Sequence, residues 1–263
     1  RRQRQMCIRD RVPTDNGGLI PEELDKILET TPNCKFIYVI PDFQNPTGRT
    51  WSMERRQKFM EVVNKHNLPV LEDNPYGELR YEGTILPSLK SMDTKGLVMF
   101  LGTFSKIFCP GLRLGWIAAE HSLLSEFVKI KQSADLHTSN FDQGVADAYM
   151  EQYDLDEHVK EIVALYKHRR DLILESMEKY FPAGTEWTHP EGGLFLWLTF
   201  PEGVSARKVF NKCIEMKVAG VIGDAFYPNQ KTDRSMRINY SNMPDDRIVE
   251  GIQRMAKAIK ECM

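Results

Sequence analysis

The chain has 263 residues and a mass of 30.4 kDa, which predicts one large domain together with part or all of a second one. Its 35 lysines and arginines nearly balance 37 aspartates and glutamates, leaving a formal net charge of −2. This balance argues against a protein that binds nucleic acid through a strongly basic surface. No apolar run approaches the roughly 18 residues of a membrane-spanning helix, and the first residues lack the apolar core of a signal peptide. We expect a cytoplasmic protein with neither nucleic-acid nor membrane partners.

The five cysteines are scattered along the chain, and no two of them form a Cys-x-x-Cys pair. A set of this kind does not suit a disulfide framework and lacks the spacing of zinc ligands. We therefore expect free thiols and no metal site. Cys109 lies near the lysine motif described below, and we expect it to be a small packed side chain.

The first eleven residues contain five arginines and little apolar periodicity. We expect residues 1–11 to be a tail or a foreign leader. From Val12 onward, short apolar stretches rich in β-branched residues alternate with amphipathic helices, which predicts a sheet covered on both faces and the α/β class. The expected helices of this part are 21–30, 52–66, 121–131 and 141–152, and the expected strands are 35–40, 68–72, 98–101 and 114–119.

A long helix over residues 156–180 precedes a change in the order of the elements. Beyond it the pattern predicts a smaller α+β unit, with strands at 184–188, 194–200, 218–222 and 235–240 and helices at 205–216 and 245–262. We therefore expect an incomplete large domain over residues 12–155, with a central mixed and mostly parallel sheet. The connecting helix and a C-terminal small domain would occupy residues 156–263.

Polar side chains interrupt this pattern where the apolar strands end, and open α/β sheets place their ligand crevices there. Taken singly, each has an ordinary structural explanation as a turn residue, a helix cap or an exposed lysine. Together they form a set drawn from the ends of three strands: Asn45 after the first, Asp73 and Tyr76 after the second, and Thr103, Ser105, Lys106 and Arg113 after the third.

This set supplies what pyridoxal phosphate requires. A lysine among apolar neighbours can lose its proton and form a Schiff base with an aldehyde, which suits Lys106. The pyridinium nitrogen needs an acid, which Asp73 provides, and the phenolic oxygen needs donors, which Asn45 and Tyr76 provide. Hydroxyls and a guanidinium suit the phosphate, and the sequence offers them at Thr103, Ser105 and Arg113.

Five motifs then identify a family resemblance. They are PDFQNPTGR (41–49), LEDNPYGELRY (71–81), GTFSKIFCPGLRLGW (102–116), HPEGGLFLWL (189–198) and MRINYS (236–241). In their order and residues the chain resembles a pyridoxal-phosphate-dependent aminotransferase of fold type I, class I/II. Within that group it is most similar to the 2-aminoadipate and kynurenine-type transaminases. The resemblance covers essentially everything after Val12.

The resemblance implies a role for each matching residue. Lys106 resembles the Schiff-base lysine, which also moves the proton at Cα, so the catalytic residues would be Lys106, Asp73 and Tyr76. Arg237 resembles the arginine that grips the substrate α-carboxylate, with Asn45 beside it, whereas we expect the nearby Arg234 to form a surface ion pair. The implied reaction is ping-pong transamination between an α-amino acid, such as 2-aminoadipate or an aromatic or other bulky amino acid, and a 2-oxo acid such as 2-oxoglutarate. The implied full-length protein is a homodimer.

Members of this family have a longer N-terminal part, by roughly one domain. We therefore expect a C-terminal fragment whose central sheet lacks strands and whose activity in isolation is doubtful. Most of the residues that read the substrate side chain would lie in the absent part. Asp135 and His137 could contact the substrate side chain or lie near a dimer surface. Phe195 could line the site or only pack beside it.

Two other functions stay open. The aminotransferase-like effector domain of a MocR/GntR-type transcriptional regulator keeps the lysine but binds DNA through an N-terminal winged helix. Asn45 before Pro46 and the Pro75-Tyr76 pair after Asp73 favour the enzyme. A non-catalytic protein that inherited the fold is the third possibility, but such a protein would be expected to have lost at least one member of the set.

Overall fold

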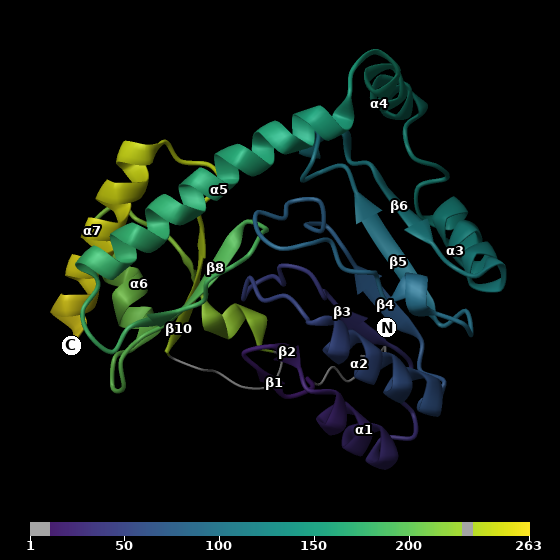
Figure 1. Ribbon diagram of the computed structural model, residues 1–263, viewed down its shortest axis with the longest axis horizontal. Helices are drawn as coiled ribbons and strands as arrows, with labels where there is room; N and C mark the ends of the chain where they lie inside the picture. Colours follow the sequence, from purple (N-terminus) through teal and green to yellow (C-terminus); the bar gives the residue numbers. More distant parts are fainter. Residues whose placement is uncertain (1–10, 228–233) are drawn as a thin grey trace.

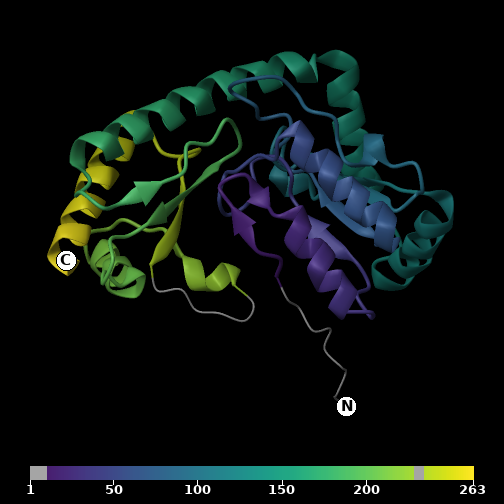
Figure 2. The same cartoon turned by 60° about the horizontal axis from the view of Figure 1, so that its bottom comes forward.

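The computed structural model describes residues 11–227 and 234–263, so the expected tail lies outside the described residues except for Arg11. The described chain is arranged around two four-stranded sheets, and the long helix α5 (Leu155–Tyr180) runs along both of them (Figure 1). A turned view shows the same two groups of elements on either side, with α5 bridging them (Figure 2). The first sheet and its helices come from the N-terminal part of the chain, and the second sheet follows α5.

The first sheet is mixed and mostly parallel, as predicted. Its strand order is β3-β4-β5-β6, with the first three strands parallel and β6 antiparallel to β5. The four strands are β3 (Ile37–Val39), β4 (Val70–Asp73), β5 (Val98–Thr103) and β6 (Gly115–Ala118). Because β3, β4 and β5 run the same way, their carboxyl ends meet at one edge of the sheet.

Two amphipathic helices cover one face of this sheet. In α1 (Pro21–Thr30) and α2 (Met53–His66), Leu24, Phe59 and Val63 are buried against the strand residues Val70 and Val98. The Ser52 hydroxyl accepts the main-chain N–H of Arg55 at 3.2 Å and so caps the start of α2. A short hairpin, β1 (Thr14–Asp15) and β2 (Gly18–Leu19), precedes α1.

The second sheet is antiparallel throughout, in the order β7-β8-β10-β9. Its strands are β7 (Glu186–Trp187), β8 (Phe195–Thr199), β9 (Val221–Ile222) and β10 (Ser235–Asn239). The helices α5, α6 (Ala206–Glu215) and α7 (Asp245–Cys262) pack on one face, where Met177, Val209 and Ile259 are fully buried with Leu198 and Met236 of the sheet. This is the α+β unit expected from the sequence.

The helices α3 (His121–Ala134) and α4 (Asn140–Gln152) differ from the others, because α3 has no buried residue and α4 has only Ala146. Large apolar side chains are exposed on them, including Ile130 and Phe141, and Trp116 of β6 is exposed as well. The described residues also form three short 3-10 helices, at Lys90–Met92, Pro110–Leu112 and Gly223–Phe226. Of the helices in the described ranges, none is long and apolar enough to cross a membrane.

Main-chain contacts fasten the loop before β8 to the segment after β4. The N–H of Gly193 donates to the carbonyl of Leu79 at 2.8 Å, and the N–H of Tyr81 donates to the carbonyl of Glu191 at 2.8 Å. A Cβ at Gly192 would lie 2.4 Å from Cζ of Phe43, so only glycine allows this close approach. These contacts fix the position of the second sheet relative to the loop that follows β3.

Candidate active site

The structure brings the predicted strand-end residues to one edge of the first sheet. Asp73 is the last residue of β4 and Thr103 the last of β5, while Asn45 lies in the loop after β3. Asp73 is paired with Leu101 in the parallel ladder, and the next N–H, that of Asn74, donates to the carbonyl of Leu101 at 3.0 Å. The parallel direction of the three strands therefore gathers side chains that are far apart in the sequence.

Arg237 reaches this edge from the second sheet. It lies on β10, and its Nη1 donates to Oδ1 of Asn45 at 2.7 Å across 192 residues of sequence. The Asn45 side chain also donates a hydrogen bond to the hydroxyl of the buried Tyr76. Burial raises the pKa of Tyr76 and the charge of Asp73 raises it further, while Arg237 and the hydrogen bond from Asn45 act in the opposite direction.

The guanidinium of Arg237 is held between aromatic rings. Its central carbon lies 4.1 Å from the ring centroid of Phe195 and 5.1 Å from that of Phe226. Desolvation lowers the pKa of Arg237, and within the described part of the chain its Nε is buried without a hydrogen-bond partner. No carboxylate among the described residues forms an ion pair with it. A planar, desolvated cation with an unused donor is suited to binding a carboxylate.

Asp73 has a partner that the sequence reasoning did not identify. The hydroxyl of Tyr38 on β3 donates to Oδ2 of Asp73 at 2.5 Å. Burial raises the pKa of Tyr38, and the hydrogen bond to Asp73 raises it further. The strand register carried a signal for this contact, because Tyr38 is paired with Leu71 and therefore lies on the same face as Asp73 two residues later.

The loop after β5 carries the predicted lysine. Thr103 shapes this loop: its hydroxyl donates to the carbonyl of Leu114 at 3.1 Å and accepts the N–H of Ser105 at 3.1 Å. Lys106 is half-buried, and its amine has no ion-pair or hydrogen-bond partner among residues 11–227 and 234–263. The adjoining Ile107 packs against the apolar cluster that contains Tyr76 and Phe195.

Arg113 lies across the ladder from this loop, just before β6. Its backbone is left-handed, with φ of 55°, and its Nη1 donates to the carbonyl of Pro110 at 3.1 Å. The side chain is exposed, and the pairing of Thr103 with Gly115 places the start of β6 beside the end of β5. Arg113 is therefore at the edge where the other predicted residues lie.

Three other expectations have different outcomes. Asp135 and His137 are exposed; Asp135 pairs with Lys131 at 2.6 Å, and Nδ1 of His137 contacts the carbonyl of Thr138 at 2.9 Å. Arg234, expected in an ion pair, has no ion-pair partner among the described residues and donates from Nε and Nη2 to the carbonyl of Phe200, at 3.2 and 3.0 Å.

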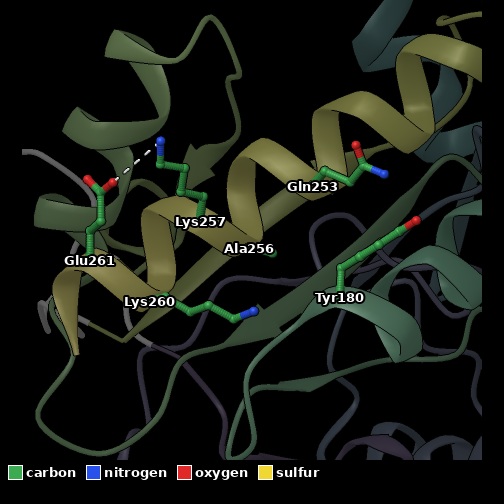
Figure 3. A pocket seen from close by; sticks show the side chains of 6 residues that line it. All are labelled: Tyr180, Gln253, Ala256, Lys257, Lys260 and Glu261. Carbon is green, nitrogen blue, oxygen red and sulfur yellow. Dashed lines mark ion pairs between the residues drawn. The ribbon is translucent and has the colours of Figure 1, made fainter.

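One hollow of the described surface, of about 620 Å³, is lined by Gly48 of the loop after β3 and by Trp197, the β8 partner of Arg237, but by none of the predicted site residues. Another, of about 460 Å³, lies between the end of α5 and α7 (Figure 3). Its lining includes Tyr180, Lys260 and an ion pair of Lys257 with Glu261, and it contains none of the predicted site residues.

Comparisons with known proteins agree with this geometry. The family model "Aminotransferase class I and II" matches residues 5–255. Aromatic-amino-acid aminotransferase 1 of Thermococcus litoralis is 42% identical over 96% of this chain, and 2-aminoadipate transaminase of Thermus thermophilus is 31% identical over 95%. The crystal structure of Pyrococcus horikoshii kynurenine aminotransferase, in complex with PMP, superposes with a TM-score of 0.91 at 40% identity, covering 95% of this chain and 63% of that one.

The chain spans 61% of the Thermococcus protein and 63% of the Thermus protein. A Bacillus subtilis protein named an uncharacterized HTH-type transcriptional regulator is also similar, at 30% identity over 87% of this chain and 47% of its own length. The family model nevertheless covers almost the entire sequence, and the chain belongs to the class I and II aminotransferase family.

Proposed function

We propose that the whole protein is a pyridoxal-phosphate-dependent aminotransferase that exchanges an amino group between an α-amino acid and a 2-oxo acid. The observation that carries the proposal is the hydrogen bond from Arg237 to Asn45, beside the buried Tyr76. This contact brings the guanidinium of Arg237, on β10, to the edge of the first sheet where Asp73 and Lys106 also lie, and so supports its assignment to the substrate carboxylate. The names of the similar proteins support the same reaction.

The residues present fit pyridoxal phosphate. Lys106 offers an amine without a partner in the described chain, Asp73 a carboxylate at the end of β4, and Tyr76 a buried hydroxyl hydrogen-bonded to Asn45. Lys106 would hold the aldehyde carbon, Asp73 the ring nitrogen, and Asn45 with Tyr76 the phenolic oxygen. The phosphate would be held by the remaining members of the set, which are Thr103, Ser105 and Arg113. When bound, the cofactor supplies an aldehyde for the amino group and a protonated ring that withdraws electrons from the substrate Cα.

The chain's own residues then account for the substrate steps. Arg237 and Asn45 bind and orient the α-carboxylate, with the guanidinium held in place by the rings of Phe195 and Phe226. These rings also exclude water from the charged contact, which strengthens it. Lys106 moves the proton at Cα as general base and then general acid. We propose 2-aminoadipate, aromatic and other bulky amino acids as donors, with 2-oxoglutarate as acceptor.

The organisation of the whole protein forms part of the proposal. We assign residues 12–155 to the large domain and residues 156–263 to the connecting helix and small domain; the two sheets joined by α5 support this division. We also propose a homodimer. The exposed Trp116, Ile130 and Phe141, the last with 78% of its surface accessible, support a covering partner or segment in the whole protein. The cytoplasmic location stays a prediction.

Borohydride trapping tests the cofactor assignment. Pyridoxal phosphate is added to the purified protein, the visible spectrum is recorded before and after borohydride, and the reduced adduct is located by peptide mass. We expect the adduct on Lys106. Lys106→Ala should abolish the visible band, while Lys129→Ala, which removes an exposed lysine paired with Glu126, should retain it. A borohydride-sensitive band that survives Lys106→Ala would refute the assignment.

A turnover assay distinguishes an enzyme from the effector domain of a regulator. The loaded protein is assayed with 2-aminoadipate, kynurenine, leucine and phenylalanine as amino donors to 2-oxoglutarate, and Arg237→Lys is compared with Arg247→Lys. Arg237→Lys should raise KM for the amino acid, because lysine cannot replace a planar two-pronged donor. Arg247 is an exposed residue that pairs with Glu250, so its replacement should have no effect. A cofactor bound at Lys106 without turnover of any donor would favour an effector domain.

A further inference from the structure

The contact between Tyr38 and Asp73 takes no direct part in the proposed reaction. Asp73 accepts one hydrogen bond among the described residues, from the hydroxyl of Tyr38 to Oδ2, and the described part of the chain provides no cation to pair with it. Its other oxygen, Oδ1, has no protein donor there. The carboxylate at the end of β4 is therefore oriented by a single neutral donor.

The position of Tyr38 explains how the hydroxyl reaches this carboxylate. In the parallel ladder Tyr38 lies opposite Leu71, and Asp73 is two residues further along the same face of β4. Half of the surface of Tyr38 is accessible, so burial of the ring in the core does not determine where its hydroxyl lies. Across the ladder on the opposite face, Ile37 and Val39 pair with Val70 and Glu72 instead. Strand register thus places one phenol within reach of one carboxylate.

We propose that Tyr38 is a positioning residue for the cofactor: its hydroxyl holds Oδ2 of Asp73 in the charged form and leaves Oδ1 for the ring nitrogen. The inference rests on the proposed function, in which Asp73 holds that nitrogen. A hydrogen bond to an ionised group is stronger than one between neutral groups, so the Tyr38 hydroxyl favours the charged carboxylate. The proton shared between Asp73 and the ring nitrogen then stays on the nitrogen, where electron withdrawal needs it.

Two separate effects are expected when the Tyr38 hydroxyl is removed. In Tyr38→Phe the carboxylate loses the one donor that it has among the described residues, so with the cofactor bound the proton between the ring nitrogen and Asp73 would shift toward the carboxylate. The ring nitrogen is also held less firmly, and the affinity for pyridoxal phosphate falls. Loss of a hydrogen bond to a charged group corresponds to a change of about tenfold or more. A tyrosine that only fills space on the sheet would produce neither effect, since phenylalanine keeps the ring.

The test uses the purified protein loaded with pyridoxal phosphate labelled with ¹⁵N at the ring nitrogen. The ¹⁵N chemical shift reports whether this nitrogen carries a proton, and an absorbance titration of the apoprotein gives the dissociation constant of the cofactor. The variants are Tyr38→Phe, Asp73→Asn and the double variant. Tyr180→Phe is the control, because Tyr180 is at the far end of α5 and lines the separate hollow. Circular dichroism verifies the fold of each variant.

We expect Tyr38→Phe to move the ¹⁵N shift toward the unprotonated value and to weaken cofactor binding about tenfold, as for a charged hydrogen bond. In the Asp73→Asn background the same substitution should change neither quantity, because Tyr38 acts through the carboxylate. A ¹⁵N shift and an affinity that match the wild type in Tyr38→Phe would overturn the inference alone. An effect that persists in the Asp73→Asn background would also overturn it. Failure of the wild type to form the borohydride-sensitive band would instead refute the proposed function, and the inference with it.

Discussion

A buried ion cluster lies in the loop after β3, three residues before Asn45, and its loss should destabilise the protein. Oδ1 of Asp42 accepts Nη2 of Arg56 at 2.7 Å and Nη2 of Arg80 at 3.2 Å. The Arg56 side chain is completely buried and that of Asp42 is 11% exposed. Asp42→Asn keeps the size of the side chain and removes its charge. Breaking a buried ion pair from one side leaves an uncompensated charge, which destabilises by about 3 to 5 kcal/mol.

Two features of the structure determine how much the free energy of unfolding should fall in Asp42→Asn. Arg56 keeps hydrogen bonds to the carbonyls of Trp51 and Pro87, at 3.3 and 3.0 Å, and asparagine keeps one acceptor oxygen. We therefore expect the lower end, a loss of about 3 kcal/mol in the free energy of unfolding. A second consequence is local. Arg80 also lies over the ring of Phe43, 4.8 Å from its centroid, so the loop leading to Asn45 should loosen.

The control is a second aspartate–arginine pair with a similar N···O distance and greater exposure. Oδ2 of Asp15 lies 2.8 Å from Nη2 of Arg55, but the Asp15 side chain is 46% exposed. An exposed pair contributes about 0 to 1 kcal/mol, so Asp15→Asn should change stability little. Urea unfolding followed by circular dichroism measures both variants against the wild type. Equal losses in the two variants, or a loss below about 1 kcal/mol in Asp42→Asn, would refute the argument from burial.

Three further predictions concern single buried groups. Burial raises the pKa of Glu72 against the hydrogen bonds that it accepts from two main-chain N–H groups, so its charged form is disfavoured in the folded state. The stability that it contributes is lost as the pH rises through the raised pKa. In urea titrations, the free energy of unfolding of the wild type relative to Glu72→Gln should therefore increase as the pH is lowered from neutral toward the ordinary pKa of glutamate. Burial raises the pKa of the Cys213 thiol to about 12, so iodoacetamide at mildly alkaline pH should label the exposed Cys34 and spare Cys213 in mass spectra of the folded protein. Tyr240→Phe removes a buried hydroxyl that donates to the carbonyl of Gly193 at 3.0 Å, and should lower the free energy of unfolding by about 1 kcal/mol, against no change for Tyr153→Phe.

Helices and strands were largely predictable from the sequence because local patterns determine them. The expected helices 21–30 and 245–262 match α1 and α7, and Ser52 at the start of the expected helix 52–66 is the cap of α2. The pairing of the strands was harder to predict from the sequence. That β6 runs antiparallel to β5 depends on the short connection through residues 104–114, whose course follows from tertiary contacts such as that of Thr103 with Leu114. The strands of the hairpin β1–β2 have two residues each, which is too short for a periodic pattern in the sequence.

Some residues of the candidate site were predictable from the sequence, and others were not. Strand-end position identified Asn45, Asp73 and Thr103 as neighbours, since parallel strands bring their carboxyl ends together. Arg237 was found only through its motif, because nothing local indicates that β10 would meet a loop 192 residues earlier. Tyr38 was missed because the sequence pattern marks it as an ordinary strand residue. Its partner is determined by the register of two strands, which only the folded sheet reveals.

The arrangement of the charged residues in the site depends on uncharged packing contacts between the two sheets. Arg237 can meet Asn45 only if the second sheet lies at one fixed distance from the first, and that distance is set where Gly192 packs against Phe43. The main-chain bond from Gly193 to Leu79 holds the same junction. A single hydrogen bond contributes a few kcal/mol even in a low-dielectric site, which is too little to hold two sheets in a fixed arrangement. The side chains at the junction therefore form their hydrogen bonds between segments that backbone packing has already brought together. The close approach of glycine main chain to the loop after β3 is therefore what makes the polar chemistry at the sheet edge available.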